Sequence, residues 1–236
     1  MSRLGALYLT KHTGPKHTAT VIVFHGSGGN GENMKEWVNL MTKKFVFPHI
    51  KVLYPTAPLQ PYTPSNGMMS NVWFDRTDIS LSAPEMLDSL DRIKLDVLQL
   101  IKKENELGIP NNRIIVGGFS MGGALSFHIG YRWVKDLAGV FAFSSFLNEK
   151  SIVYEELKGS QFKDEATTRQ LRPPLFQVHG DSDMMVDLSW GHYTHDTLTS
   201  HGVQGEFHVL QKLGHSLNKR GMNMIKDWID KILPDE

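Results

Sequence analysis

Short runs of consecutive apolar residues alternate along this chain with longer segments in which apolar residues recur every three or four positions. Val21-Ile22-Val23-Phe24 and Ile114-Ile115-Val116 are apolar at successive positions, as strands buried on both faces of a sheet usually are. The pattern predicts strands over Leu4–Thr10, Ala19–His25, Ile50–Tyr54, Arg113–Phe119, Ala138–Ser144, Leu175–His179 and Gly205–Leu210.

Helical periodicity is clearest over Ala83–Leu107, where apolar residues form one stripe at three- and four-residue steps. Ser82 and Glu85 predict a capping box at its start, and Gly108 predicts its end. Further helices are predicted over Glu32–Lys44, Met121–Trp133, Leu188–His201 and Leu217–Ile232. Strands and helices that alternate in this way indicate a mostly parallel central sheet with helices on both faces.

The segment Tyr54–Ala83 shows neither period and has prolines at positions 55, 58, 61 and 64. It is therefore predicted to be a long loop. A loop of this length inside a compact domain is usually functional or well packed.

Composition narrows the class of protein. The 236 residues are 40% hydrophobic, which suits one globular domain, predicted over residues 1–236. Lys plus Arg and Asp plus Glu both number 25, so there is no overall charge to attract nucleic acid or an anionic membrane. The absence of cysteine excludes disulfides, thiolate metal sites and a cysteine nucleophile. No apolar run approaches ~18 residues, so we expect a cytoplasmic protein without stable membrane insertion.

The segment Arg113–Ala124 carries the strongest chemical signal. A buried strand enters Gly118-Phe119-Ser120-Met121-Gly122, and a helical pattern follows it. This is G-x-S-x-G between a strand and a helix, the context in which α/β-hydrolases expose a nucleophilic serine on a sharp turn. Side chains at Gly118 and Gly122 would collide with the neighbouring strand or helix. The motif predicts an α/β-hydrolase fold with Ser120 as nucleophile.

A serine hydroxyl needs a positioned base, and on this fold the acid and then the histidine follow the serine along the chain. His215 lies after the last predicted strand, next to Gly214 and before the final helix, as a catalytic imidazole would. The other histidines after Ser120 are better explained by packing or by a solvated helix face, and they are His128, His179, His192, His195, His201 and His208.

Three aspartates after the strand Leu175–His179 compete for the role of the acid. Asp181 could instead stabilise the turn through backbone hydrogen bonds, and Asp187 could cap the next helix. Asp183 lies between them and is the preferred candidate, because its carboxylate would hold the imidazole tautomer and stabilise the imidazolium.

Negative charge on the carbonyl oxygen must be met by preorganised N–H groups. The residue after the nucleophile, Met121, supplies one candidate backbone donor. The strand Ala19–His25 leads into Gly26-Ser27-Gly28-Gly29, which predicts the backbone N–H of Ser27 as the second. The alternative is a flexible glycine-rich turn without a catalytic task. His25 is expected to be a structural brace.

The segments that carry these candidates occur in a fixed order along nearly the whole chain. They are Phe24-His25-Gly26-Ser27-Gly28, Tyr54-Pro55-Thr56-Ala57-Pro58, Trp73-Phe74-Asp75, Gly118-Phe119-Ser120-Met121-Gly122-Gly123, His179-Gly180-Asp181-Ser182-Asp183 and Gly214-His215. In this order they resemble the acyl-protein thioesterases and lysophospholipases. Ser27 after the His-Gly pair and Met121 after the nucleophile make the chain most similar to the lysophospholipase-like branch.

The resemblance implies a cytosolic hydrolase without a cofactor, which acts on thioesters of S-acylated proteins, on lysophospholipids or on simple carboxylic esters. It also strengthens Asp183 as the acid of the triad. Acyl-protein thioesterases usually have Leu where Ser27 stands and Gln where Met121 stands. These differences favour short acyl chains over palmitoyl.

Residues of an acyl pocket are predicted in the segments Pro64–Pro84, Phe146–Tyr154 and Met184–Val186. Their apolar side chains could form an adaptable wall, although core packing is the alternative for each. The candidates are Met68, Met69, Trp73, Leu81, Phe146 and Met184. Trp73 is expected to brace the site together with its neighbours Phe74 and Asp75. No metal is expected.

Two other functions remain compatible with the residues. One is an acyl-binding protein that kept the fold without catalysis. The other is a serine peptidase, although peptidases on this fold generally carry an added cap or propeller domain. The sequence does not indicate an oligomeric state.

Overall fold

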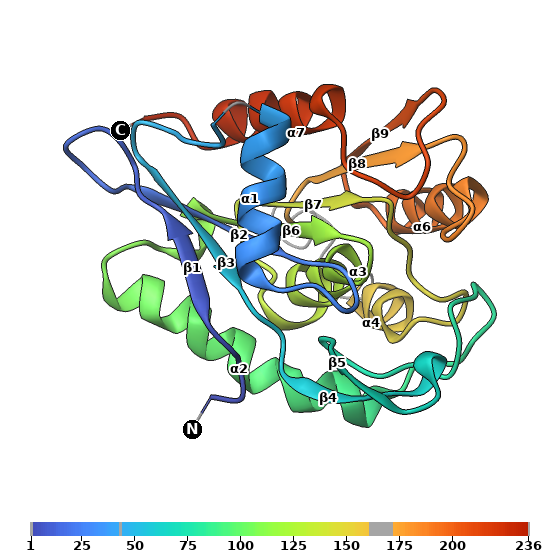
Figure 1. Cartoon of the computed structure of the whole chain (residues 1–236). Helices are drawn as coiled ribbons and strands as arrows, with labels where there is room; N and C mark the ends of the chain where they lie inside the picture. The colour runs from blue at the N-terminus through green and yellow to red at the C-terminus, as the bar shows by residue number, and fades with distance from the viewer. Residues whose placement is uncertain (1, 43, 161–171, 236) are drawn as a thin grey trace.

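A computed structural model describes residues 2–42, 44–160 and 172–235. Its centre is a seven-stranded sheet in the order β1-β3-β2-β6-β7-β8-β9 (Figure 1). Only β1 runs antiparallel to its neighbour, and the other adjacent pairs are parallel. The strands are β1 (Leu7–Thr10), β2 (Ala19–Phe24), β3 (Ile50–Pro55), β6 (Ile114–Phe119), β7 (Gly139–Phe143), β8 (Leu175–Gly180) and β9 (Gly205–Leu210). The predicted mostly parallel sheet is confirmed.

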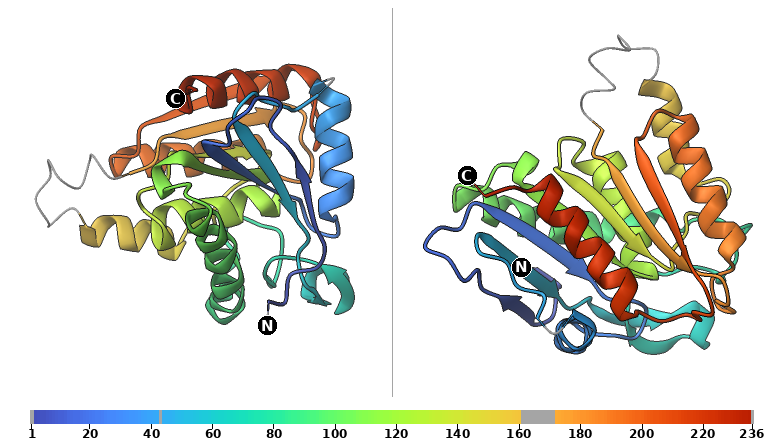
Figure 2. Two further views of the ribbon diagram at one scale, coloured as in Figure 1. Left: turned by 90° about the vertical axis from the view of Figure 1, so that its left-hand side faces the viewer. Right: turned by 90° about the horizontal axis from the view of Figure 1, so that it is seen from above.

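Helices cover both faces of the sheet (Figure 2). One face carries α1 (Gly31–Thr42) and α7 (Lys219–Ile232), whose apolar side chains share a core with Phe119. The opposite face carries α2 (Leu87–Glu106), α3 (Met121–His128), α4 (Ile152–Ser160) and α6 (Leu188–Ser200), over a second core.

The burial of each strand follows its sequence pattern. Strands β2, β6, β7 and β8 are buried at every residue, which explains their uninterrupted apolar runs. Strand β1, at one edge, alternates between exposed and half-buried residues, and β9 at the other edge mixes exposed and half-buried residues and has one buried residue. The segments with the most continuous apolar sequence therefore form the middle of the sheet.

The predicted loop Tyr54–Ala83 contains a two-stranded antiparallel hairpin, which the sequence did not indicate. Its strands are β4 (Leu59–Tyr62) and β5 (Met68–Asn71), joined through a 3₁₀ turn, η1 (Thr63–Ser65). Pro61 argues against a strand in the sequence, because proline has no N–H to donate to a neighbouring strand. Each strand of a two-stranded ribbon has one unpaired edge, so a residue without an N–H can be accommodated there.

The helices differ from prediction in several places. Helix α6 ends at Ser200 and helix α7 begins at Lys219, slightly inside their predicted bounds. Helix α2 begins at Leu87, and Ser82 does not cap it, because tertiary contacts engage the Glu85 side chain. Helix α4 was not predicted. Helix α1 ends at Thr42, and Lys43, inside the predicted helix, lies outside the described residues. After the 3₁₀ turn η2 (Asn111–Arg113) and β6, α3 continues as one turn of π-helix, η3 (Ile129–Trp133), so the predicted helical segment is covered.

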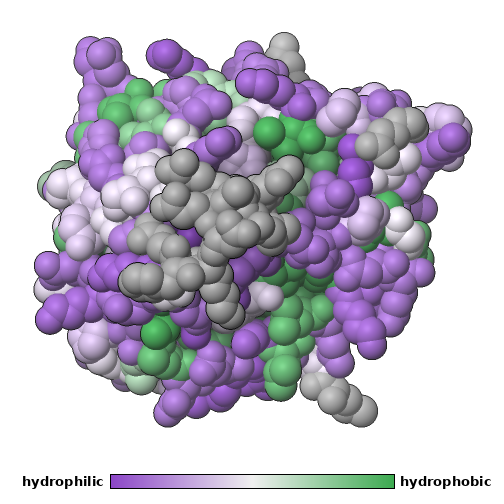
Figure 3. Space-filling view, turned by 180° about the vertical axis from the view of Figure 1, so that it is seen from behind, coloured by the Kyte–Doolittle hydropathy of each residue, from purple (hydrophilic) through white to green (hydrophobic). Residues whose placement is uncertain are grey.

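Within the described ranges, no helix combines the length and apolarity that crossing a bilayer requires. On the face seen from behind, hydrophilic residues predominate and hydrophobic ones form separate patches (Figure 3).

Candidate active site

Ser120 lies on the sharp turn between β6 and α3. Its backbone has φ 54° and ψ −121°, a strained conformation for a residue with a side chain. Two contacts hold the turn, because the Ser120 N–H donates to the Phe143 carbonyl at 2.9 Å and Ser145 Oγ donates to the Ser120 carbonyl at 2.7 Å. A Cβ at Gly118 or Gly122 would collide with a carbonyl oxygen of β2. The glycines of the motif thus permit the close approach that exposes Ser120.

His215 and Asp183 form a hydrogen-bonded pair at the carboxyl edge of the sheet. His215 Nδ1 donates to Asp183 Oδ2 at 2.8 Å, and its ring packs on Phe119 with centroids 4.7 Å apart. Asp183 Oδ1 accepts the N–H groups of Met185 (3.0 Å) and Val186 (2.9 Å). Burial would raise the pKa of Asp183, but the hydrogen bonds from His215 and these amides outweigh it and hold the pKa below its usual value. The carboxylate is therefore charged and oriented.

The competing aspartates have other partners. Asp181 accepts the N–H of Lys212 at 2.6 Å and so fastens the turn after β9. Asp187 caps α6 by accepting the N–H of Ser189 at 2.8 Å. Among the three candidates, Asp183 is the one in contact with His215.

His179 supports Asp183 from the other side. The buried His179 Nε2 donates to the Val186 carbonyl at 2.9 Å and lies 3.6 Å from Asp183 Oδ2. Burial lowers the pKa of His179 and favours the neutral ring. Its role is to hold the loop that carries the acid.

Ser120 and His215 line the same cavity. No hydrogen bond joins these two described side chains in the structure. Since catalytic hydrogen bonds often tighten only when substrate binds, the lack of this bond is compatible with proton transfer from Ser120 to His215. The hydrogen bond to Asp183 places the proton on His215 Nδ1, which leaves Nε2 as the nitrogen able to accept one.

Two unpaired backbone amides lie at the same cavity. Ser27, in the loop after β2, and Met121, the first residue of α3, both line it. In the described part of the chain, neither amide donates a backbone hydrogen bond. Both are thus free to bind an oxygen at the positive end of α3.

His25 braces this loop. Its Nδ1 donates to the Gly26 carbonyl at 2.7 Å, and its Nε2 accepts the N–H of Ala57 at 3.0 Å. Trp73 Nε1 in turn donates to the His25 carbonyl at 2.8 Å. Burial lowers the pKa of His25 to about 4, so the ring is neutral at pH 7. This geometry agrees with a structural role for His25 and Trp73.

The cavity beside Ser120 has a volume of about 220 Å³. Phe146 lines it, as predicted for the acyl pocket. Met68, Met69 and Met184 are 66%, 58% and 100% exposed and do not line it. Trp73 is buried and does not line it either. The full lining is Gly26, Ser27, Arg76, Ile79, Phe119, Ser120, Met121, Ala124, Ser145, Phe146, Met185, Val186 and His215.

Of the residues predicted for the acyl pocket, only Phe146 thus lines this cavity, and a role of the others in binding an acyl chain stays a prediction. The hairpin β4–β5 holds Met68 and Met69 toward solvent, and the turn after Asp183 directs Met185 rather than Met184 to the cavity. Leu81 is half-buried, and its carbonyl accepts the Glu149 N–H at 2.8 Å, away from the lining. Further lining residues were not predicted for the pocket. Phe119 and Ala124 belong to the segment around the nucleophile, whereas Arg76, Ile79 and Ser145 reach the cavity through tertiary packing.

No group of three or more His, Cys, Asp and Glu side chains suited to a metal ion occurs among the residues that the structure describes.

Comparison with known proteins agrees with the site. Residues 9–233 match the family model described as phospholipase/carboxylesterase. The chain is 44% identical over 222 residues to lysophospholipase-like protein 1 of Mus musculus, which covers 94% of this chain and 90% of that protein. It is 33% identical over 224 residues to acyl-protein thioesterase 1 of Neurospora crassa, and this match covers 93% of this chain and 89% of that protein. The resemblance seen in the sequence motifs is thereby confirmed.

The fold is also that of a solved relative. The crystal structure of acyl-protein thioesterase 2 from Zea mays superposes with a TM-score of 0.83 at 26% sequence identity, covering 97% of this chain and 99% of that one. The predicted α/β-hydrolase fold is confirmed.

Proposed function

Since the chain belongs to the phospholipase/carboxylesterase family of ester and thioester hydrolases, we propose that Ser120, His215 and Asp183 are its catalytic triad. One observation carries the proposal. The hydrogen-bonded pair Asp183–His215 lies at the cavity into which the strained turn presents Ser120, beside two unpaired amides.

Acylation begins when His215 Nε2 accepts the proton of Ser120 Oγ as the oxygen attacks the substrate carbonyl. The carbonyl oxygen becomes an anion and accepts hydrogen bonds from the N–H groups of Ser27 and Met121. Asp183, which is charged and buried, stabilises the imidazolium through Nδ1. His215 then donates its proton to the leaving alcohol or thiol, and an acyl-Ser120 ester remains.

Deacylation repeats these steps with water as the nucleophile. His215 accepts a proton from the water, the same amides hold the second oxyanion, and Ser120 Oγ leaves with the proton that the histidine returns. No cofactor enters either half of the reaction.

The size of the cavity supports short acyl chains. At about 220 Å³ it lies below the ~300–1,000 Å³ that is usual for pockets of drug-sized ligands. We therefore propose that small carboxylic esters and short-chain thioesters are turned over faster than palmitoyl esters. S-acylated proteins and lysophospholipids stay candidate substrates on the strength of the relatives' names. A cytoplasmic location also stays a prediction, which microscopy of the tagged chain would test.

A fluorophosphonate probe tests the nucleophile. We expect labelling of the wild-type protein and none of Ser120→Ala, whereas a non-catalytic acyl-binding protein would not be labelled at all. Labelling that persists in Ser120→Ala would remove the assignment.

A series of 4-nitrophenyl esters from butyrate to palmitate tests the acyl preference. We expect kcat/KM to be highest for the short chains and to decline with length. A steady rise toward palmitate would contradict the proposal on chain length, and hydrolysis of peptides but not of esters would favour a peptidase.

A further inference from the structure

Arg76 is a buried arginine in the wall of the cavity that contains Ser120. It follows Asp75 in the segment between β5 and α2, and it is 9% exposed. Its guanidinium carbon lies 5.1 Å from the centre of the Phe74 ring and 5.7 Å from that of Phe146. The side chain is therefore held between two aromatic rings beside the reaction centre.

The hydrogen-bonding capacity of this guanidinium is not used. The buried Nε–H has no acceptor, and no hydrogen bond or ion pair of the side chain occurs within the described residues. An arginine has five N–H donors in a planar fork, and buried donors are almost always paired. An unpaired buried cation at a cavity indicates a partner that comes from outside the chain.

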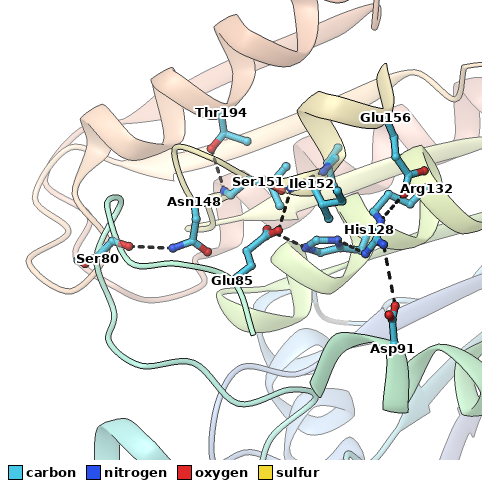
Figure 4. A network of polar contacts seen from close by, with 12 residues as sticks. Ser80, Glu85, Asp91, His128, Arg132, Asn148, Ser151, Ile152, Glu156 and Thr194 are labelled. Atoms are coloured by element: carbon cyan, nitrogen blue, oxygen red, sulfur yellow. Dashed lines mark hydrogen bonds and ion pairs between the residues drawn. The ribbon is translucent and has the colours of Figure 1, made fainter. Parts of the chain in front are cut away.

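The carboxylates nearest in the chain are engaged elsewhere. Glu85 contacts His128 Nε2 at 3.3 Å and accepts the N–H of Ile152 at 2.9 Å, and Figure 4 shows both carboxylate oxygens turned toward these partners. Asp75 accepts the N–H and the hydroxyl of Thr63 at 2.8 and 2.6 Å. Neither forms an ion pair with Arg76.

The electrostatic surroundings of Arg76 agree with a guanidinium charge that neighbouring groups compensate only in part. Burial lowers the pKa of Arg76, while Tyr62, Glu85 and Asp75 act in the opposite direction. An arginine stays protonated even so. Among the described residues that line the cavity, none is Asp or Glu, so the positive charge of Arg76 has no carboxylate beside it in the cavity wall.

The position of Arg76 relative to His215 decides which part of a substrate it meets. His215 packs on Phe119, which belongs to the core under α1 and α7. Arg76 packs on Phe74, which belongs to the core on the opposite face of the sheet. Because His215 protonates the leaving group, that group would lie on the histidine side, and an acyl chain that extends away from His215 would meet Arg76.

We propose that Arg76 binds a carboxylate at the far end of the acyl chain, so that the preferred substrates are half-esters or half-thioesters of short dicarboxylic acids. The fork of the guanidinium matches the two oxygens of a carboxylate. The apolar residues Ile79 and Phe146 of the same cavity would contact the methylene groups between the two ends. This inference rests on the proposed role of Ser120.

Two esters with acyl chains of six carbons test the inference. One is mono-4-nitrophenyl adipate, whose chain ends in a carboxylate, and the other is 4-nitrophenyl hexanoate, whose chain ends in a methyl group. For each enzyme the ratio of kcat/KM for adipate to that for hexanoate is measured. We expect Arg76→Met to lower this ratio by about tenfold to a hundredfold, the range of a charge-assisted hydrogen bond. Arg76→Lys should give an intermediate ratio.

Controls separate this inference from the proposed function. The exposed Arg92 provides the matched variant Arg92→Met, which should leave the ratio unchanged. Ser120→Ala supplies the background rate for both esters. If Ser120→Ala loses hydrolysis of hexanoate but the ratio is the same in wild type and Arg76→Met, the inference fails and the proposed function stands. If Ser120→Ala hydrolyses both esters at the wild-type rate, the proposed function fails.

A second pair of esters tests whether Arg76 binds an anion on the acyl chain or on the leaving group. The butyrate ester of 5-hydroxy-2-nitrobenzoate carries its carboxylate on the leaving group, and 4-nitrophenyl butyrate does not. One result would overturn the acyl-side assignment. The wild-type protein would prefer the ester with the anionic leaving group, would lose that preference in Arg76→Met, and would not prefer the adipate ester over the hexanoate ester. Arg76 would then bind an anionic leaving group, such as a phosphodiester.

A measurement on the wild-type protein does not depend on the folding of variants. Adipate and hexanoate are compared as competitive inhibitors of 4-nitrophenyl butyrate hydrolysis. We expect adipate to have an inhibition constant about tenfold lower. Equal constants, or a lower constant for hexanoate, would overturn the inference.

Discussion

Asp183 and His215 form one carboxylate–histidine pair of this molecule, and Glu85 and His128 form another. In the first pair the atoms are 2.8 Å apart and the imidazole is 15% exposed at the cavity. In the second they are 3.3 Å apart, and both side chains are almost fully buried between the start of α2, α3 and α4 (Figure 4). In both carboxylates burial would raise the pKa, and hydrogen bonds outweigh it and leave the pKa lowered.

The two pairs differ in what the second ring nitrogen meets. His128 Nδ1 lies 3.4 Å from a nitrogen of Arg132, so both ring nitrogens contact other side chains. His215 lines the cavity that Ser120 also lines, and its Nε2 has no hydrogen-bond partner among the described residues. A carboxylate–histidine pair can transfer protons only where one nitrogen is open to a reacting group, and elsewhere it joins elements of the fold.

Removing each histidine in turn should separate the two roles most strongly. We expect His215→Asn to lower kcat by about 10⁴- to 10⁶-fold with little change in stability. His128→Asn leaves Glu85 buried without its partner and should cost about 3–5 kcal/mol of unfolding free energy, with kcat of the folded protein within tenfold of wild type. Ester hydrolysis and urea unfolding measure the two effects. A folded His128→Asn protein that is as inactive as His215→Asn would contradict the distinction between a structural and a catalytic pair.

Replacing the carboxylates by amides should give the same contrast at a smaller scale. Asp183→Asn should lower kcat by about 10⁴-fold, because the amide stabilises the wrong tautomer of His215. Glu85→Gln should cost about 1–3 kcal/mol of stability and leave kcat nearly unchanged. Steady-state kinetics at a temperature where both variants are folded measure this. An Asp183→Asn variant within tenfold of wild type would contradict the triad.

Acid should weaken the structural pair within a defined pH range. The folded pKa of Glu85 lies below its ordinary value of 4.5, so its ionised form stabilises the protein above pH 4.5. This contribution is lost as the pH falls through the lower folded pKa. The difference in unfolding free energy between wild type and Glu85→Gln should therefore shrink below pH 4.5, as urea titrations at several pH values would measure. A difference that is constant from pH 6 to pH 3 would contradict this account.

His25 causes a separate loss of stability in acid, which wild type and Glu85→Gln share. Its folded pKa of about 4 lies below the ordinary 6.5, so unfolding takes up a proton as the pH falls between these values. The shift corresponds to about 3 kcal/mol of stability at pH 7 that is lost between pH 6.5 and 4. The comparison of wild type with Glu85→Gln removes this contribution.

The outer end of the Glu85–His128 network should matter least. Arg132 contacts Glu156 at 2.8 Å and Asp91 at 3.9 Å, and these carboxylates are 36% and 59% exposed. Water screens such pairs, so Arg132→Gln should cost about 1 kcal/mol or less and should not change kcat. Thermal unfolding and ester hydrolysis of the variant check this. A loss of stability as large as that of His128→Asn would show that the contacts of Arg132 stabilise the protein as much as the buried pair does.

Motifs governed by backbone geometry could be predicted from the sequence. The glycines around Ser120 indicate a turn that no side chain at those positions would allow, and the structure shows the collision they avoid. Strands β2 and β6 could be predicted for a similar reason, because burial on both faces requires continuous apolar residues.

Features that depend on distant contacts could not be predicted. The pair Ser82 and Glu85 fits a capping box, but Glu85 forms its contacts with α3 and α4 and the helix begins at Leu87. Met68 and Met69 are apolar, and only the hairpin shows that they point to solvent. Local sequence carries no signal of where such side chains end up.

The sequence by itself determined the strands of the central sheet, the turn at Ser120 and the identity of the candidate nucleophile and base, because these depend on local sterics and on the chemistry of single side chains. Only the tertiary structure decided that Asp183 rather than Asp181 or Asp187 meets His215. It alone brought Arg76 to the cavity. Both outcomes follow from the packing of segments far apart in the chain, and the distances between such segments are not encoded in any local pattern.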